Sequence, residues 1–321
     1  MDLSQLRENT HELRRLLGSK VLGQPQVIDL VVLTVLCGGH ALLTGAPGVA
    51  KTTLVRSLAQ ALGSGYKRIQ FTPDLTPFDI LGGDTIQFDE KNPDLKRIAF
   101  APGPIFAPFI LADEINRASP RTQSALLEAM QERQVSLNGQ SRQLPRPFYV
   151  FATQNPIENE GTFPLPEAQL DRFLVNIDVG YPNFETELQV ATLSATEKEL
   201  PAVAGASLIV NARQAIEQIP MPQALLEACV RLVRDTRPGE SRLGLVKSYV
   251  DYGASPRASQ GLVLAAKAAA FLNNASQVGW EHVAQVAPAV LQHRLVLNFR
   301  AATERISSLE VCRTLVAESV L

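Results

Sequence analysis

A short stretch in the first fifth of the chain has the residue types of a phosphate-binding loop. It consists of Gly45, Ala46, Pro47, Gly48, Val49, Ala50, Lys51, Thr52 and Thr53. Glycines leave backbone N–H groups free to point at a polyphosphate, and a following helix adds the positive end of its dipole. Lys51 would bind the outer phosphates, and the Thr52 hydroxyl would bind Mg²⁺. The stretch predicts nucleotide binding; the alternative is a glycine-proline turn with a surface lysine.

One residue of this stretch departs from the usual pattern G-x-x-x-x-G-K-[ST]. Ala50 stands where the pattern has its second glycine. We expect the cost to be small, because a methyl group at the start of a helix need not block the phosphates.

An acidic pair follows a short apolar run at 109–112. The run predicts a buried parallel strand, and ligands of open α/β sheets bind at the carboxyl ends of such strands. Asp113 would complete the Mg²⁺ shell, and Glu114 would orient and activate the attacking water. Acidic pairs also end strands without any catalytic role, but the phosphate loop upstream favours catalysis.

The elements that must position these residues form an α/β core. Apolar runs predict strands at 40–44, 66–71, 109–112, 148–153 and 174–178. Helical spacing and capping residues predict helices at 3–18, 25–37, 53–62 and 120–132.

Two hairpins and a change of pattern complete the predicted architecture. The first hairpin pairs 85–88 with 97–100 inside the second helix of the core, and the second turns at Asn138-Gly139. Beyond Tyr181-Pro182, helical spacing replaces the strand runs. We therefore predict an α/β core with a central parallel sheet over residues 1–182, and an all-α lid of about five helices over 183–321.

Composition narrows the class of protein. The 321 residues are 45% hydrophobic, enough for a large core and a second domain, and the net charge of −2 gives no general basic surface for nucleic acid. No apolar run reaches the roughly 20 residues that cross a bilayer, and 1–20 lack a signal-peptide core, so we expect a cytoplasmic protein. Cys37, Cys229 and Cys312 lie far apart in apolar surroundings, which predicts buried thiols.

Five motifs, taken together and in order, resemble those of AAA+ ATPases. They are the phosphate loop, Asp113-Glu114, and the segments 152–156, 166–173 and 253–258. Three stretches, 71–74, 111–117 and 123–132, resemble the MoxR family of these ATPases specifically. The resemblance covers nearly the whole chain.

The resemblance implies roles for further residues. Asn155 matches the polar sensor that positions the water near the γ-phosphate, although Asn155-Pro156 is also a good turn pair. Arg172 matches the arginine finger that reaches the nucleotide of the neighbouring subunit; the alternative is a local ion pair with Asp171. Gly23 and Gln24 lie in a segment that resembles the adenine side of the site.

Arg257 matches the second sensor, which reaches from the lid to the nucleotide of its own subunit. A physical argument accompanies the resemblance: Ser255 as N-cap and Pro256 at the first helical position put Arg257 in the first turn, where the helix dipole disfavours a cation. A phosphate opposite Arg257 would resolve that conflict. The alternative is a solvated arginine.

The function that this resemblance implies is a chaperone-like motor that uses ATP and Mg²⁺. Such proteins form homo-oligomeric rings, here expected to be hexamers, and work on a protein client with a partner that bears a von Willebrand factor A domain. The hairpins would surround the pore and touch the client, unless they only cover sheet edges or subunit contacts. A nucleic-acid motor and a small-molecule phosphotransferase remain as alternatives.

Overall fold

The computed structural model describes residues 2–88, 96–156, 161–192, 200–203 and 205–319. Its centre is a five-stranded sheet with the order β2-β5-β8-β1-β9, and each neighbouring pair is parallel. The strands are β1 (Ala41–Thr44), β2 (Tyr66–Gln70), β5 (Phe109–Asp113), β8 (Tyr149–Gln154) and β9 (Val175–Asp178). All five predicted strands are confirmed.

Alternate residues of the central strands face two separate apolar layers, as the two-residue repeat of a strand requires. Phe109 and Leu111 pack with helices α1 (Leu3–Lys20), α2 (Pro25–Cys37) and α3 (Lys51–Ala61). On the other face, Ile110 and Ala112 pack with α4 (Pro77–Leu81) and α5 (Pro120–Glu132). Burial of both faces explains why these strands are apolar throughout.

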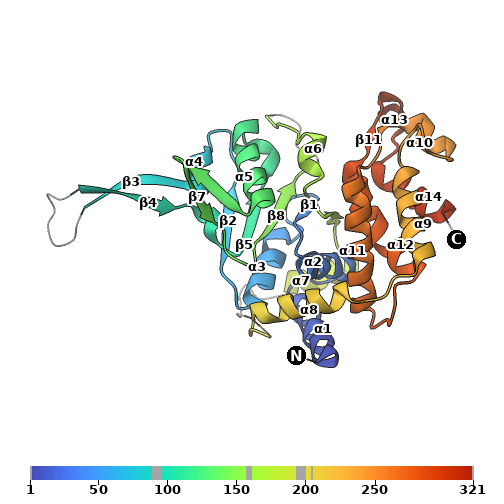
Figure 1. The fold of residues 1–321 in the computed structure, drawn as a ribbon, viewed down its shortest axis with the longest axis horizontal. Helices are drawn as coiled ribbons and strands as arrows, with labels where there is room; N and C mark the ends of the chain where they lie inside the picture. Colours follow the sequence, from blue (N-terminus) through green and yellow to red (C-terminus); the bar gives the residue numbers. More distant parts are fainter. Residues whose placement is uncertain (1, 89–95, 157–160, 193–199, 204, 320–321) are drawn as a thin grey trace.

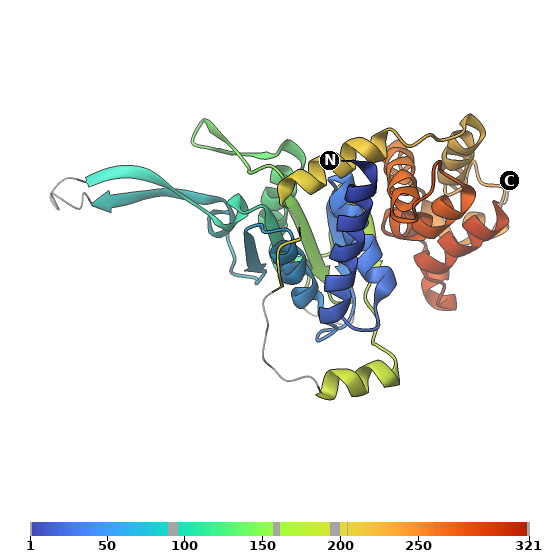
Figure 2. The ribbon, with the colours of Figure 1, turned by 90° about the horizontal axis from the view of Figure 1, so that it is seen from below.

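Both predicted hairpins are present and lie on the side of the sheet away from the C-terminal helices (Figures 1 and 2). Strands β3 (Gly82–Phe88) and β4 (Lys96–Pro102) form a long arm between α4 and the 3₁₀ turn η1 (Pro104–Phe106). Strands β6 (Gln134–Leu137) and β7 (Gln140–Gln143) turn at Asn138 and Gly139, whose φ values are 51° and 75°. The two hairpins touch, because Asn138 Nδ2 donates to Asp84 Oδ2 at 2.7 Å.

The C-terminal region is mainly helical and packs beside α2 and β9 (Figure 1). Its helices in the described residues are α7 (Phe184–Thr192), α8 (Ala206–Glu217), α9 (Gln223–Arg234), α10 (Gly244–Tyr249), α11 (Pro256–Leu272), α12 (Trp280–Leu291), α13 (Phe299–Glu304) and α14 (Ser308–Glu318). A short helix, α6 (Glu167–Leu170), precedes β9, and the 3₁₀ turns η2 (Ile115–Arg117) and η3 (Gln292–Arg294) follow β5 and α12.

The prediction for this region needs two corrections. It has more helices than the five expected, and it is not wholly helical, because β10 (Val250–Tyr252) pairs with β11 (Val296–Leu297). Strands of two or three residues are too short to show an alternating pattern in the sequence. The boundary at 182/183 stays a prediction; α8 packs on α1 and α2 as well as on α11.

Other expectations concern the cysteines and the membrane. Cys37, Cys229 and Cys312 are buried, as predicted, and burial raises the pKa of Cys37 and of Cys229 to about 12. Among the described helices, none has both the length and the apolar character needed to span a bilayer.

Candidate active site

The phosphate loop connects β1 to α3, and its two glycines are needed for different reasons. A Cβ on Gly45 would lie 2.2 Å from the carbonyl oxygen of Val179, so no larger residue fits there. Gly48 has a φ of +83°, which L-residues with a side chain rarely adopt. The loop conformation therefore depends on glycine at both positions.

Ala50 has a larger backbone cost than we expected from the sequence. It has φ 62° and ψ 19°, the left-handed conformation, directly before the first residue of α3. The expectation considered only the space in front of the phosphates. The missing glycine matters instead for the backbone, because this conformation costs about 1–2 kcal/mol for a residue with a Cβ.

Replacing Ala50 with glycine should therefore stabilise the protein. We expect Ala50→Gly to raise the free energy of unfolding by up to about 1 kcal/mol, since the relief of strain exceeds the entropy that glycine adds to the unfolded chain. Ala46→Gly is the matched control: Ala46 is buried in the same loop without a positive φ, so this change should destabilise. Denaturant unfolding measures both, and an equal loss in the two variants would contradict the strain at Ala50.

Lys51 points back over the loop toward the acidic pair. Its Nζ donates to the Gly45 carbonyl at 2.6 Å. Burial lowers the pKa of Lys51, and the charges of Asp113 and Glu114 oppose this shift. Thr52 and Thr53 follow in the first turn of α3. The structure thus brings the predicted phosphate-binding lysine and the two predicted carboxylates into one site.

Asp113 ends β5 and is held from both neighbouring strands. Arg68 on β2 donates to Asp113 Oδ2 through Nη2 at 2.6 Å and through Nε at 3.0 Å. Thr153 on β8 donates to Asp113 Oδ1 at 2.5 Å. The carboxylate is therefore fixed at the carboxyl end of the sheet, where the sequence placed it.

Glu114 lies just beyond the strand in a left-handed conformation with φ 56° and ψ 50°. Its N–H donates to Thr153 Oγ1 at 2.8 Å, and its Oε2 accepts from Gln70 at 2.8 Å. Arg117 forms an ion pair with the same oxygen at 3.1 Å. A residue other than glycine is strained in this left-handed conformation. Strained residues that are held in place by several hydrogen bonds cluster at functional sites.

We did not identify Arg68, Gln70, Arg117 or Thr153 from the sequence. Arg68 and Gln70 are two residues apart on β2, so they lie on the same face of the sheet, and Gln70 is in register with Asp113. The sequence signal for Arg68 and Gln70 is a pair of polar residues, two positions apart, in the strand that lies beside β5. It could be interpreted only once the strand order was known.

The structure brings three further predicted residues to the same edge of the sheet. Asn155 is buried directly after β8. Gln24 donates to the Gly180 carbonyl at 3.1 Å, next to Val179, which touches Gly45. A Cβ on Gly23 would meet Thr186 of α7 at 2.7 Å. Gln24 therefore lies close to the phosphate loop, and the role of Gly23 and Gln24 at the adenine side stays a prediction.

Arg172, in contrast, lies at the opposite edge of the sheet. It precedes β9, and it lines a cavity of about 410 Å³ together with Gly39 and His40, which precede β1. The phosphate loop follows the other end of β1, about 15 Å away at 3.3 Å per residue. We call this the arginine cavity; its lining includes Arg133, Arg172, Arg213, Arg257, Arg294 and a single acid, Asp171.

That Arg257 reaches the nucleotide of its own subunit stays a prediction, and the position of Arg257 does not favour it. Arg257 lines the arginine cavity beside Arg172, far from the phosphate loop. The reason is the packing of α11, which crosses the start of β9 so closely that a Cβ on Gly261 would lie 3.3 Å from Leu174. The local prediction is confirmed: Ser255 caps α11, and Pro256 is its first residue.

The alternative of a local ion pair between Arg172 and Asp171 is not what the structure shows. Asp171 pairs with Arg294 at 2.7 Å instead. Within the described parts of the chain, the Nε of Arg172 is buried without a hydrogen-bond partner. Arg257 is exposed at the mouth of the same cavity. Within the part of the chain that the structure describes, the arginine cavity thus presents two cations, Arg172 and Arg257, without a paired carboxylate.

Comparison with known proteins shows the family to which the chain belongs. The profile of the ATPase family associated with various cellular activities (AAA) matches residues 40–175, and that of the AAA lid domain matches 243–313. The chain is 43% identical to Chaperone MoxR1 of Mycobacterium tuberculosis over 89% of this chain and 75% of that protein. It is 33% identical to Protein MoxR of Paracoccus denitrificans, over 88% and 87% of the two chains.

The chain belongs to the MoxR family of AAA+ ATPases. The fold agrees with this membership: a solved structure of a protein described as an ATPase from Cytophaga hutchinsonii is 38% identical, covers 99% of this chain and has a TM-score of 0.90. This MoxR-family chain is accordingly a chaperone-like ATPase, and the predicted AAA+ fold is confirmed.

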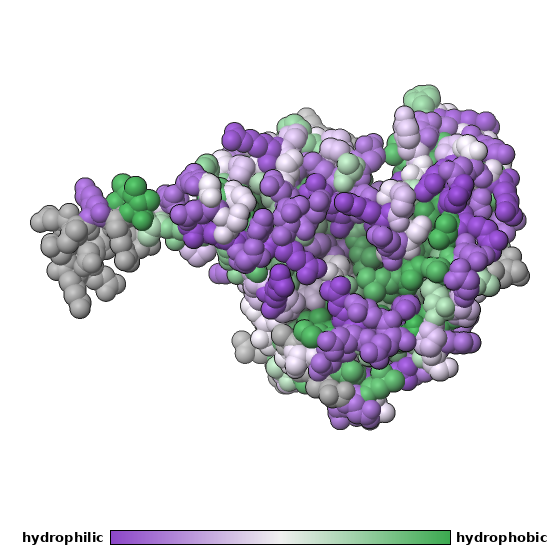
Figure 3. Space-filling model, viewed as in Figure 1, coloured by the Kyte–Doolittle hydropathy of each residue, from purple (hydrophilic) through white to green (hydrophobic). Residues whose placement is uncertain are grey.

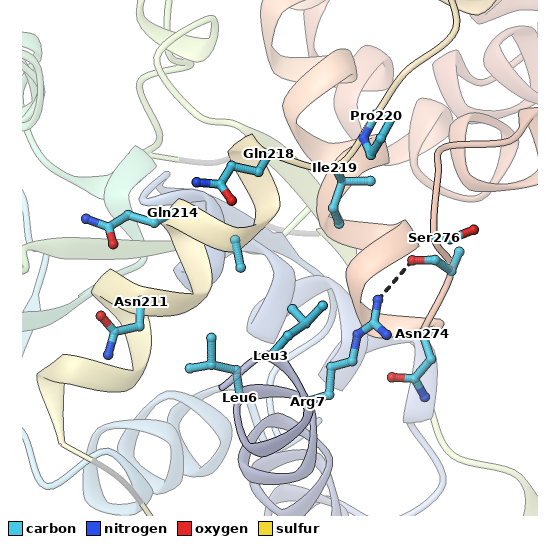
Figure 4. A pocket seen from close by; sticks show the side chains of 12 residues that line it. Leu3, Leu6, Arg7, Asn211, Gln214, Gln218, Ile219, Pro220, Asn274 and Ser276 are labelled. Atoms are coloured by element: carbon cyan, nitrogen blue, oxygen red, sulfur yellow. Dashed lines mark hydrogen bonds between the residues drawn. The ribbon is translucent and has the colours of Figure 1, made fainter. Parts of the chain in front are cut away.

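One further cavity of this MoxR-family chain lies apart from the site. It has a volume of about 670 Å³ and lies between α1, α8 and the loop after α11 (Figure 4). Arg7 at its wall donates to the Ala275 carbonyl at 2.9 Å and lies over the ring of Phe271. None of the predicted site residues lines this cavity.

Proposed function

We propose that the chain forms head-to-tail rings in which each ATP site is completed by Arg172 and Arg257 of the neighbouring subunit. One observation carries the proposal: both arginines line a cavity at the amino edge of the sheet, whereas the phosphate loop of the same chain lies at the carboxyl edge. A heterologous ring places one face of each subunit against the opposite face of the next. The MoxR resemblance favours six subunits.

In this proposal, the chemistry is divided among residues of two subunits. Lys51 and the loop amides bind the phosphates, Glu114 orients the attacking water and takes its proton, and Asn155 positions that water. Arg172 and Arg257 of the neighbour stabilise the negative charge that develops on the phosphoryl oxygens.

The oxygen donors of the site fit Mg²⁺. The Thr52 hydroxyl and the Asp113 carboxylate are hard ligands, and Mg²⁺ is usually held by one or two carboxylates together with substrate phosphates. Bound Mg²⁺ would neutralise charge on the phosphates.

We further propose that the motor remodels a protein client, with the β3–β4 arm as the contact. Ile86 and Ile98 face each other across this arm and are 62% and 77% exposed, and they form an apolar spot on its far part (Figure 3). Exposed apolar pairs suit protein surfaces better than a phosphate backbone. A cytoplasmic setting and a partner with a von Willebrand factor A domain complete the proposal.

A trapping experiment tests the client. Glu114→Gln should hold ATP-state complexes, so proteins retained by this variant in ATP can be compared with those retained by Glu114→Gln combined with Ile86→Ser and Ile98→Ser. We expect the arm variant to keep ATP binding and lose retained proteins. Val210→Ser is the control, because Val210 is an apolar residue on α8 that is 52% exposed. Salt-sensitive stimulation of the ATPase by DNA would favour a nucleic-acid motor instead, and transfer of phosphate to an acceptor other than water would favour a phosphotransferase.

A further inference from the structure

The carboxylate of Asp171 connects the α/β core to the C-terminal helices at the arginine cavity. Arg294 Nε donates to Asp171 Oδ1 at 2.7 Å, and Ser255 Oγ donates to Asp171 Oδ2 at 2.8 Å. Asp171 directly precedes Arg172, whereas Ser255 lies two residues before Arg257. One carboxylate therefore links the segments that carry both unneutralised arginines.

Arg294 is built into the structure rather than lying on its surface. Its side chain is only 4% exposed. Besides Asp171, its guanidinium donates to the carbonyls of Phe173 at 2.7 Å and Leu174 at 3.2 Å, and to that of Val290. The planar guanidinium thus fixes the backbone on the C-terminal side of Arg172 as well as the carboxylate on its N-terminal side.

Ser255 fixes the backbone beside Arg257 in a similar way. Its hydroxyl donates to Asp171 while its oxygen accepts from the Arg257 N–H at 3.2 Å, as the cap of α11. The first turn of α11 is thereby fixed relative to the residue before Arg172. Capping of α11 uses only the Ser255 oxygen as an acceptor, so the bond that the Ser255 hydroxyl donates to Asp171 is additional to the cap.

Like charges gather around the cavity. The bonds of Asp171 to Ser255 and Arg294, which we call the Asp171 tie, oppose their repulsion. Several arginines line the cavity, and Asp171 is the one acid among its described lining residues. Burial lowers the pKa of Arg294, the bond to Asp171 opposes this shift, and the charge of Arg257 adds to it, so the two guanidiniums are close enough to repel each other. The negative charge of Asp171 offsets this repulsion between like charges where the core meets α11.

We propose that Ser255 and Arg294 are positioning residues that act through Asp171 to hold Arg172 and Arg257 as one unit for the nucleotide of the neighbouring subunit. This inference rests on the ring proposed above. A displacement of about 1 Å in a positioning group can cost 10²-fold in rate, so loss of the tie should lower turnover without changing ATP affinity.

The test measures ATPase activity in two kinds of mixture. The donor assay asks how well the arginines of a variant subunit complete the ATP site of a neighbour, and the acceptor assay asks how well the ATP site of the variant works with the arginines of a neighbour. In the donor assay the variant is mixed with Arg172→Ala subunits, whose ATP sites are intact. In the acceptor assay it is mixed with Lys51→Ala subunits, whose arginines are intact. The variants are Ser255→Ala and Arg294→Lys, with Ser255→Thr to restore the hydroxyl and Ser307→Ala as the matched loss of a serine cap. Thermal unfolding confirms that each variant folds.

We expect Ser255→Ala to lose at least ten-fold relative to wild type in the donor assay, and Arg294→Lys to behave likewise. In the acceptor assay, activity should fall only to about half of that of wild type mixed with Lys51→Ala. The reason is that, with random mixing, half of the neighbours of each variant subunit are Lys51→Ala subunits with intact arginines. Ser255→Thr should restore donor activity, and Ser307→Ala should match wild type in both assays.

Other results overturn the inference. Wild-type donor activity in Ser255→Ala and Arg294→Lys would show that the tie has no role, and loss of ATP affinity or equal loss in both assays would show a general structural role. The ring proposal is tested separately by mixing Lys51→Ala with Arg172→Ala. If that mixture is active while Ser255→Ala donates normally, the inference alone fails.

Discussion

Glu114→Gln should bind ATP as the wild type does and turn it over at least about 10²-fold more slowly, the contribution expected of a positioned general base. The amide keeps the shape of the side chain and its contact with Gln70, and Asp113 remains with its bonds to Arg68 and Thr153. Only the carboxylate that we propose as the base for the attacking water is lost. Lys51→Ala should instead abolish ATP binding, because it removes the cation at the phosphates.

Nucleotide affinity and steady-state turnover measure both variants. Glu128→Gln is the matched control, because Glu128 is an exposed glutamate on α5 and undergoes the same chemical change away from the site. Hydrolysis at the wild-type rate by Glu114→Gln would show that another residue activates the water.

Arg172→Ala should lower turnover by about 10³-fold or more, the range known for arginine fingers, with unchanged ATP affinity. The reason is its place at the edge of the sheet opposite the phosphate loop of its own chain. Arg257→Ala should behave in the same way, although the sequence alone suggested a contact with ATP in its own subunit. Arg231→Ala on the exposed side of α9 is the control.

The same measurements decide whether these arginines act on their own subunit. Weaker ATP binding by isolated subunits of Arg257→Ala would show that α11 reaches the nucleotide within one chain. That result would contradict the position of Arg257 in the arginine cavity.

Features that depend on local sequence were predictable. The apolar runs of β1, β5 and β8 and the loop after β1 follow from neighbouring residues, because strands buried on both faces are apolar throughout. The N-cap at Ser255 was predictable for the same reason, since Ser-Pro at a helix start is a local signal. These features give the phosphate loop, the acidic pair and the helical position of Arg257.

Features that depend on packing over long distances were not. The direction of α11 across the start of β9 decides at which edge of the sheet Arg257 lies, and this direction depends on packing between distant segments, such as Gly261 against Leu174. Arg294 lies 123 residues from Asp171 in sequence, and Arg68 lies 45 residues from Asp113. The left-handed backbone of Ala50 is set by how the loop closes onto α3, which the pattern of residue types does not contain.

The most direct test of the shared active site is to mix two inactive variants. Lys51→Ala subunits cannot bind ATP but still present Arg172, and Arg172→Ala subunits bind ATP but present no finger. In equal mixtures, random assembly should restore activity at about one interface in four. Fluorescence transfer between labelled variants confirms that subunits exchange. If exchange occurs and no ATPase activity returns at any ratio, Arg172 does not act across a subunit interface, and the shared site is wrong.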